Sequence, residues 1–297
     1  MSNMVIISPG VSINPDALEV PEESRITPDL VAGTQTLPTA NNALRAGAIS
    51  QAGFIRPVFN TALGTFLTQV DLTKWSMAQV RVTAGGSLFY NNHPTLSVTG
   101  TASVPALTAS KIGQQPRRLL TSGTTIFSAA GVSTTTPHVW RGNSSGLGGF
   151  LAVFQWACND TNVSNGTFIG FFDKDNATGF AMISNKNKFG FYADNTSGNM
   201  FFHCQSVAAV TSKIDLGANF PANDPTVQYA GVIFASPHES KIHFQLENLK
   251  TGFVAVGELT TNLPSNTTFF SPVMVRATLN TVAVRLIFNQ ITIYTPY

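Results

Sequence analysis

The sequence predicts an all-β protein whose C-terminal half is a two-sheet sandwich. Charged residues make up only 11% of the 297-residue chain, well below the roughly 25% of ordinary globular proteins, so the strong helix formers Glu, Lys and Arg are scarce. The chain holds 22 Phe, and it is rich in Val and Thr, which favour pleated, half-buried surfaces. From residue 140 onward, strand-like segments recur at short spacing with turn residues between them.

Residues 1–48 are expected to form an extended arm. Prolines interrupt the segment at positions 9, 15, 21, 28 and 38, and each removes a backbone donor and disfavours helix in the residue before it. A segment of this kind cannot build a core of its own. Such a segment is either disordered or ordered against a partner, and its apolar residues, Val5, Ile6, Ile7, Val11 and Ile13, favour docking on a partner.

Residues 49–137 are expected to form a small interface and connector region. Phe59, Leu63, Phe66, Leu67 and Val70 are spaced like one face of a helix, although the intervening Thr and Gly residues weaken it. Strand patterns follow at 74–82 and 87–90. Residues 93–139 are rich in Ser, Thr, Ala and Gly, which indicates a solvated connector or edge strands.

The sandwich is expected to span residues 138–297 and to begin at a glycine-rich turn, 140–149, that runs directly into the apolar segment 150–156. The apolar run predicts a strand buried on both faces. His243, Gln245 and Glu247 alternate with apolar residues, which predicts a strand with one wet face and one buried face. The further strands are expected at 167–172, 180–184, 189–192, 200–204, 228–234, 253–259, 273–276 and 283–294.

Composition also limits the partners and cofactors. The net charge is +2 and no basic stripe is present, so nucleic acid is not an expected partner. No apolar run reaches the ~18 residues of a membrane helix, so no membrane insertion is expected. The two cysteines, Cys158 and Cys204, are expected as buried free thiols, with a single cross-sheet bridge as the alternative. No cofactor is expected.

No catalytic constellation stands out. The serines of Gly142-Asn143-Ser144-Ser145-Gly146 do not have the spacing of a nucleophile elbow. In the loop that starts at Asp173, Ala177 offers no oxygen where a calcium loop needs one. The histidines lack a metal-like spacing to carboxylates, and the carboxylates fall mostly in predicted turns. The chain is therefore not expected to be an enzyme, and a glycan depolymerase, which needs paired carboxylates, is the least favoured alternative.

A set of linked motifs in the C-terminal half resembles a known family. The motifs are Trp140-Arg141-Gly142-Asn143 with Gly148-Gly149-Phe150, the segments 214–222 (IDLGANFPA), 249–257 (LKTGFVAVG) and 259–264 (LTTNLP), and Ile291-Thr292-Ile293-Tyr294 before the final Tyr297. In this order they resemble the C-terminal domain of tail-fibre-like and other minor virion structural proteins of tailed bacteriophages. The resemblance covers residues 138–297.

The resemblance implies a concanavalin-like or jelly-roll β-sandwich in a homotrimer, located in the virion after assembly in the bacterial cytoplasm. Residues 1–48 would then attach the chain to other virion proteins of the tail or capsid. The implied function is that of a tail fibre or receptor-binding knob that contacts host surface glycan. The alternative is a head fibre or capsid decoration protein that stabilises the capsid.

Four predicted loops, 159–166, 173–179, 194–199 and 236–240, are candidates for glycan contact. Asn and Asp side chains bond sugar hydroxyls, and aromatic rings stack on the C–H faces of sugars. The candidate residues in these loops are Asn162, Asn165, Asp173, Asp175, Asn176, Asp194, Asn195, Asn199, His238 and Glu239.

Overall fold

The computed structural model describes residues 62–63, 65–66, 75–82, 87–92, 96–105, 117–134, 136–137, 139–173, 186–193, 198–206 and 211–296. The predicted arm, residues 1–48, lies outside the described residues, as do the predicted strand at 180–184 and the candidates Asp175, Asn176, Asp194 and Asn195.

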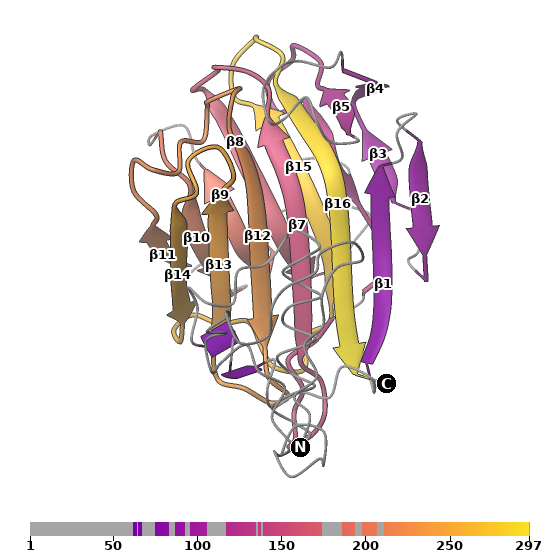
Figure 1. Ribbon diagram of the computed structural model, residues 1–297, viewed down its shortest axis with the longest axis vertical. Helices are drawn as coiled ribbons and strands as arrows, with labels where there is room; N and C mark the ends of the chain where they lie inside the picture. The colour runs from indigo at the N-terminus through magenta and orange to yellow at the C-terminus, as the bar shows by residue number, and fades with distance from the viewer. Residues whose placement is uncertain are drawn as a thin grey trace, which may run out of the picture.

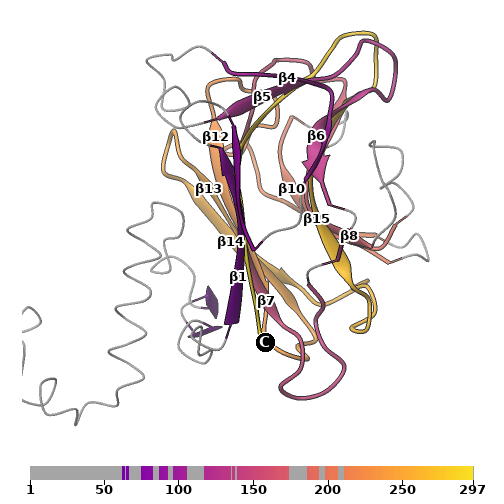
Figure 2. The same ribbon diagram turned by 90° about the vertical axis from the view of Figure 1, so that its right-hand side faces the viewer.

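The described residues form two antiparallel sheets that face each other as two layers (Figures 1 and 2). The first sheet has the order β14-β13-β12-β7-β16-β1-β2, with β5 beside β16 and β4 beside β5; the second has the order β11-β10-β9-β8-β15-β6-β3. The strands are β1 (Trp75–Val82), β2 (Leu88–Asn91), β3 (Ser97–Thr99), β4 (Thr101–Ser103), β5 (Arg118–Thr121), β6 (Ala129–Ser133), β7 (Phe150–Cys158), β8 (Asn165–Asp173), β9 (Lys188–Ala193), β10 (Phe201–Gln205), β11 (Thr211–Asp215), β12 (Gln228–Ala235), β13 (Ile242–Asn248), β14 (Val254–Leu259), β15 (Phe270–Thr278) and β16 (Arg285–Pro296).

Aromatic rings fill the space between the two sheets. Phe202 of the second sheet stacks on Phe244 of the first with ring centroids 4.2 Å apart, and Phe191 packs against Trp156 at 5.5 Å. Gly231 makes room for this packing, because a Cβ there would lie 2.4 Å from the Phe191 ring. The abundance of Phe is therefore used in the core, where large rings bury much area per residue. The predicted all-β sandwich is confirmed.

The first sheet also carries an apolar layer on its outward face. Leu151, Val153, Val232 and Phe234 point away from the core and are buried together with Leu63, Phe66 and Trp75. The described residues 62–63 and 65–66 are helical, as their spacing predicts, and Phe66 packs on Phe234 at 5.2 Å. A helical segment thus covers part of a face that would otherwise be open.

The prediction of a wet face on β13 is wrong. His243, Gln245 and Glu247 do alternate with inward-pointing apolar residues, but they are only 7%, 1% and 2% exposed. Alternation identifies the face of a strand and not what covers it. Part of the outward face of this sheet has a second apolar layer, and its member Phe234 stacks on the His243 ring at 4.9 Å.

Strands from both sides of the predicted boundary at residue 138 belong to the same two sheets. Strands β1, β2, β4 and β5 join the first sheet, and β3 and β6 join the second. The long strand β16 makes this possible, because a register shift between Phe288 and Gln290 divides it. Its first part pairs with β5 and its second part with β1. The strands β1 to β6 are therefore part of the sandwich.

Both cysteines are buried and free, as predicted. Burial raises the pKa of the Cys204 thiol to about 12, although the neighbouring Arg141 opposes the shift. A thiol in this environment stays protonated and unreactive at neutral pH.

Candidate binding site

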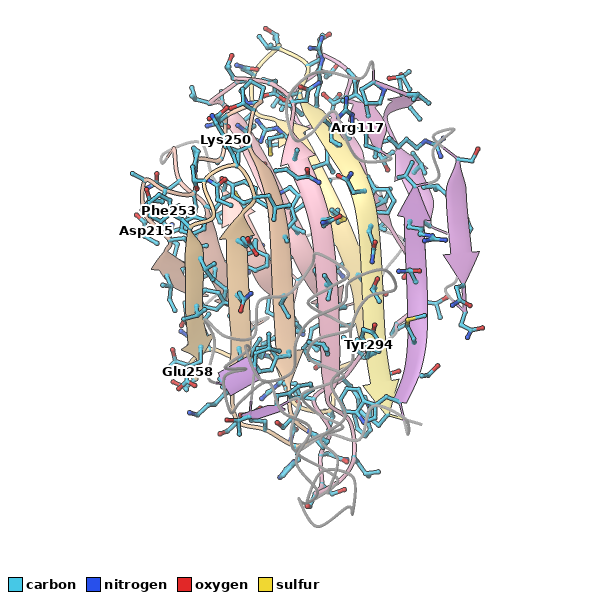
Figure 3. The ribbon with its side chains drawn as sticks, in the orientation of Figure 1. Arg117, Asp215, Lys250, Phe253, Glu258 and Tyr294 are labelled. Atoms are coloured by element: carbon cyan, nitrogen blue, oxygen red, sulfur yellow. The ribbon has the colours of Figure 1, made fainter. Side chains whose placement is uncertain are left out.

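The candidate residues divide between the two ends of the sandwich. We call the end where β7 and β15 finish and β16 begins the upper end, as it stands in Figure 1. Because strands of one sheet alternate in direction, Asn162, Asn165 and Asn199 lie at this end, whereas Asp173, His238 and Glu239 lie at the other. In Figure 3, Lys250 and Phe253 lie towards the upper end and Glu258 lies towards the lower one.

Three loops cross side by side from one sheet to the other at the upper end. They are residues 122–128 between β5 and β6, 159–164 between β7 and β8, and 279–284 between β15 and β16; we call them together the roof. The strands they join are neighbours in both sheets. Backbone bonds tie the loops to one another or to the adjoining strands: Phe127 N to Thr278 O at 2.8 Å, Ser122 N to Val284 O at 3.0 Å and Leu279 N to Ser164 O at 3.0 Å.

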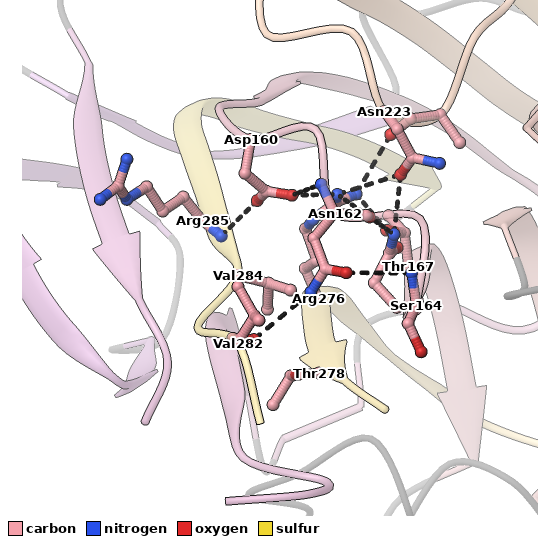
Figure 4. A network of polar contacts seen from close by, with 12 residues as sticks. Asp160, Asn162, Ser164, Thr167, Asn223, Arg276, Thr278, Val282, Val284 and Arg285 are labelled. Atoms are coloured by element: carbon pink, nitrogen blue, oxygen red, sulfur yellow. Dashed lines mark hydrogen bonds and ion pairs between the residues drawn. The ribbon is translucent and has the colours of Figure 1, made fainter. Parts of the chain in front are cut away.

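A buried arginine holds the roof from below. Arg276 is fully buried, and its Nη2 lies 2.7 Å from Asp160 Oδ1 and donates to Asn223 Oδ1 at 3.1 Å (Figure 4). Its Nη1 donates to Thr167 Oγ1 at 2.9 Å. Burial disfavours the charged form of Arg276 and so lowers its pKa. The nearby Cys158 and Asp160 favour the charged form by more, so the pKa of Arg276 stands above its ordinary value. The carboxylate of Asp160 also accepts a hydrogen bond from Arg285 N at 2.6 Å.

The roof amides are engaged in holding the loops. Asn162 and Asn280 each donate to the other's Oδ1 at 3.3 Å, and Asn280 Oδ1 accepts from Val282 N at 2.9 Å. Asn165 is buried and donates to Asn223 Oδ1 at 2.7 Å and to Asn162 O. These bonds position the loop tips, while the tips themselves carry the exposed side chains.

Large apolar side chains project from the roof. Ile126, Phe127, Val163 and Val282 are 50%, 56%, 63% and 55% exposed, and they are four of the nine most exposed large apolar residues in the described part of the chain. Around them lie exposed hydroxyls at Thr124, Thr125, Thr161 and Thr281. Sequence reasoning missed Phe127 and Val282. The available signal was the Ile126-Phe127 pair, which interrupts a Ser/Thr/Gly run without belonging to a strand pattern.

The backbone at Phe127 is left-handed, with φ at 67°. The other described non-glycine residues with positive φ are Asn92, His238 and Asn262, of types that tolerate this region better, whereas it is a real outlier for a bulky residue. The conformation costs roughly 1–2 kcal/mol. Strain of this kind concentrates at functional sites, and here it holds an aromatic ring out into solvent.

The lower end is tied mainly through the backbone. Arg141 is buried, and it donates from Nη1 to Glu239 O at 2.8 Å and from Nη2 to Pro264 O at 2.5 Å. Its own carbonyl accepts from His238 N at 2.7 Å. Desolvation lowers the pKa of Arg141, only partly countered by Cys204 and Glu239. The Trp140-Arg141-Gly142-Asn143 motif thus fastens three lower loops.

Glu239 also belongs to a small charged cluster at this end. Its Oε1 lies 2.8 Å from His243 Nε2, Glu258 Oε2 lies 3.4 Å from His243 Nδ1, and Lys241 lies 2.8 Å from Glu258. Burial tends to raise the pKa of Glu239, but bonds from His243 and Ser236 outweigh it and hold the value below its ordinary range. Throughout the described ranges, no group of three His, Cys, Asp or Glu is placed to hold a metal ion.

No helix within the described residues has the length and apolar character needed to cross a membrane.

No protein-family model and no curated protein matches the sequence. Several solved structures are similar in fold. The carbohydrate recognition domain of Emp47p aligns with a TM-score of 0.50 and 10% sequence identity, and the match covers 77% of this chain and 100% of that domain. A winged bean acidic lectin complexed with methyl-α-D-galactose is 12% identical over 74% and 98% of the two chains, with a TM-score of 0.49. A protein of unknown function from Shewanella oneidensis MR-1 is 12% identical over 74% and 86%, also at 0.49.

At such low identity the likeness concerns the fold alone. Together with the two facing antiparallel sheets, it identifies the chain as a concanavalin-like, jelly-roll β-sandwich.

Proposed function

We propose that this chain is an adhesion protein of a tailed-bacteriophage virion that binds host surface glycan through the roof of its β-sandwich. The observation that carries glycan binding is the set of exposed apolar side chains on the roof, with hydroxyls around them. The resemblance of the linked motifs in residues 138–297 supports the virion role. The fold shared with a carbohydrate recognition domain is compatible with both.

The chemistry of the roof suits a sugar. An aromatic ring such as Phe127 can stack on the C–H face of a pyranose, and threonine hydroxyls can exchange hydrogen bonds with its hydroxyl groups. Asp160 is the only charged residue in the roof, and its carboxylate is already bonded to Arg276 and to Arg285 N. A neutral surface with preformed shape binds at low entropic cost.

The virion role has two further parts, both taken from the family resemblance. The chain is proposed to be a homotrimer, and residues 1–48 are proposed to attach it to the tail. Light scattering at micromolar concentration tests the first, with a trimer expected and a monomer contradicting it. Immunogold labelling of particles with an antibody against residues 140–297 tests the second. Tail labelling is expected, and head labelling would assign the chain to capsid decoration instead.

A glycan array probed with the whole chain tests glycan binding. We expect binding to a subset of bacterial surface glycans, and loss of that binding in Phe127→Gly. The matched control is Phe253→Ala, because Phe253 is also a half-exposed phenylalanine at the upper end, at 50% exposure, but lies outside the roof. No binding by the wild type, or equal binding by both variants, would contradict the proposal.

A further inference from the structure

We infer that the roof selects a neutral sugar that carries a methyl group, in the form of a 6-deoxyhexose or an N-acetylhexosamine. This inference rests on the proposed function and specifies its ligand. It follows from the charge, the apolar side chains and the backbone geometry of the roof.

The charge of the roof excludes an acidic sugar as the preferred ligand. Arg276, which lies below the loops, is fully buried, and its two terminal nitrogens are engaged by Asp160, Thr167 and Asn223. Arg285 follows the roof at the start of β16, and its guanidinium points away from the network (Figure 4). The roof loops themselves contain no Lys, Arg or His, so a carboxylate or phosphate bound on them would have no cationic partner within the roof, and burying such a group unpaired is costly.

The aliphatic side chains favour a methyl group over a hydroxyl. Ile126, Val163 and Val282 come from three adjacent loops and are each at least half exposed. A sugar hydroxyl pressed against them would lose its water without gaining a partner, which costs free energy. A methyl group in the same place gains from burial, and one buried CH₂-sized group is worth a factor of about four in affinity.

The aliphatic tips are held in place before a ligand arrives. Val282 donates its N–H to Asn280 Oδ1 at 2.9 Å and accepts from Asn162 Nδ2 at 3.3 Å. Val163 lies inside a turn closed by Ser164 N and Asn162 Oδ1 at 3.0 Å. Because these bonds fix the backbone that carries the valines, the loops lose little freedom on binding, and less of the contact energy is spent on ordering them.

Phe127 supplies a second contact for the sugar, in addition to the aliphatic side chains. Its left-handed backbone, with φ at 67°, and its N–H bond to Thr278 O at 2.8 Å fix the main chain that carries the ring, in the loop next to that of Val282. A pyranose stacked on this ring presents its edge to the neighbouring aliphatic tips. The methyl group of a deoxy sugar or of an acetamido group is then the substituent that these tips recognise.

Saturation-transfer difference NMR and titration with the whole chain test the inference. The ligands form matched pairs: L-fucose against L-galactose, and N-acetylglucosamine against glucose. We expect the methyl-bearing member of at least one pair to bind about four-fold more tightly or better, with the strongest saturation on its methyl protons. The pair that shows the preference distinguishes a deoxy from an acetamido methyl.

Two kinds of variant complete the test. Val163→Thr and Val282→Thr replace a methyl by a hydroxyl of nearly the same size, so they should reduce the methyl preference while sugar binding persists. Phe127→Gly should weaken binding of both members at least about ten-fold, and Phe253→Ala should change neither.

Sugar binding that depends on Phe127 but shows no methyl preference would overturn this inference and leave the proposed function intact. The absence of any sugar binding would overturn both. Binding of a protein ligand to the same surface, competed by none of the sugars, would also overturn both.

Discussion

The two ends of the sandwich each contain a buried arginine that ties loops together, but they do so through different groups. At the upper end, Arg276 is paired with the carboxylate of Asp160 and donates to side-chain oxygens of Thr167 and Asn223. It also donates to the main-chain carbonyls of Ala222 and Asn162. At the lower end, Arg141 donates to main-chain carbonyls, those of Glu239 and Pro264. The upper loops are thus held at their bases by an ion pair together with side-chain and main-chain acceptors, whereas the bonds from Arg141 to the lower loops go to main-chain carbonyls alone.

The difference bears on which end can serve as a binding surface. Loops held at their bases can vary their tips without loss of the fold, and the roof tips are apolar and exposed. The lower loops have little such freedom. Gly142 and Gly148 there have positive φ, and a Cβ on either would collide with neighbouring backbone. We therefore assign binding to the upper end and structural support to the lower end, and the predictions below test this assignment.

The largest effect is expected at Gly142. A Cβ there would lie 1.6 Å from Leu147 O, and φ is +89°, so Gly142→Ala should cost roughly 4 kcal/mol or more of the free energy of unfolding. Gly146 in the same loop has φ +80° but open space around it. Gly146→Ala should cost only about 1 kcal/mol. Denaturant unfolding measures both, and equal costs would show that the lower loop is not tightly packed.

The next largest effect is expected at the upper ion pair. Asp160→Ala leaves the Arg276 charge buried without its carboxylate, which should cost about 3–5 kcal/mol. The control is Asp224→Ala, because Asp224 forms a more exposed pair with Lys250 at 3.4 Å, and breaking such a pair costs about 1 kcal/mol or less. Chemical denaturation compares the two. Similar small losses would mean that Arg276 does not organise the roof.

A smaller effect is expected at the lower arginine. Arg141→Met removes a buried charge together with its bonds to two carbonyls, so the cost of the unpaired carbonyls is partly offset by the lost desolvation penalty. We expect a loss of about 1–3 kcal/mol and unchanged glycan binding. Thermal unfolding and a binding titration measure these. Abolished binding in a folded variant would assign the lower end a direct role.

The smallest effect is expected from Glu239. Its pKa is depressed in the folded protein, so its contribution is complete above the unfolded-state pKa of about 4.3. The contribution is lost as pH falls through the folded-state value. The unfolding free energies of wild type and Glu239→Gln should therefore differ by a constant amount, about 1 kcal/mol or less, above pH ~5 and converge below ~4. A difference that grows on acidification would reverse the sign and contradict the assignment.

The sequence predicted the strands best where aromatic residues and turn residues alternate. Segments 150–156, 189–192 and 228–234 all fall within strands of the structure. The strand Ala129–Ser133 is buried at every position but consists of Ala, Gly, Val and Ser, so it has almost no hydrophobic signal and was assigned to a connector. Burial of small residues depends on what packs beside them, which the local pattern does not record.

The candidate site was predicted in part. The loops with Asn162 and His238 exist, but local patterns cannot tell which loops share an end, because that depends on how many strands separate them and in which sheet each strand lies. Phe127 was missed because an exposed aromatic in a turn resembles a fragment of a strand. Arg276 was missed because a single charge in the apolar run Val273–Ala277 reveals nothing of its partner at residue 160.

The most direct test of the division between the two ends is hydrogen–deuterium exchange of the whole chain, with and without the glycan that binds most tightly on the array. We expect new protection in peptides that cover residues 122–128, 159–164 and 279–284, and unchanged exchange in those that cover 140–149, 236–241 and 260–269. Protection confined to the second set would contradict the assignment and place binding at the lower end.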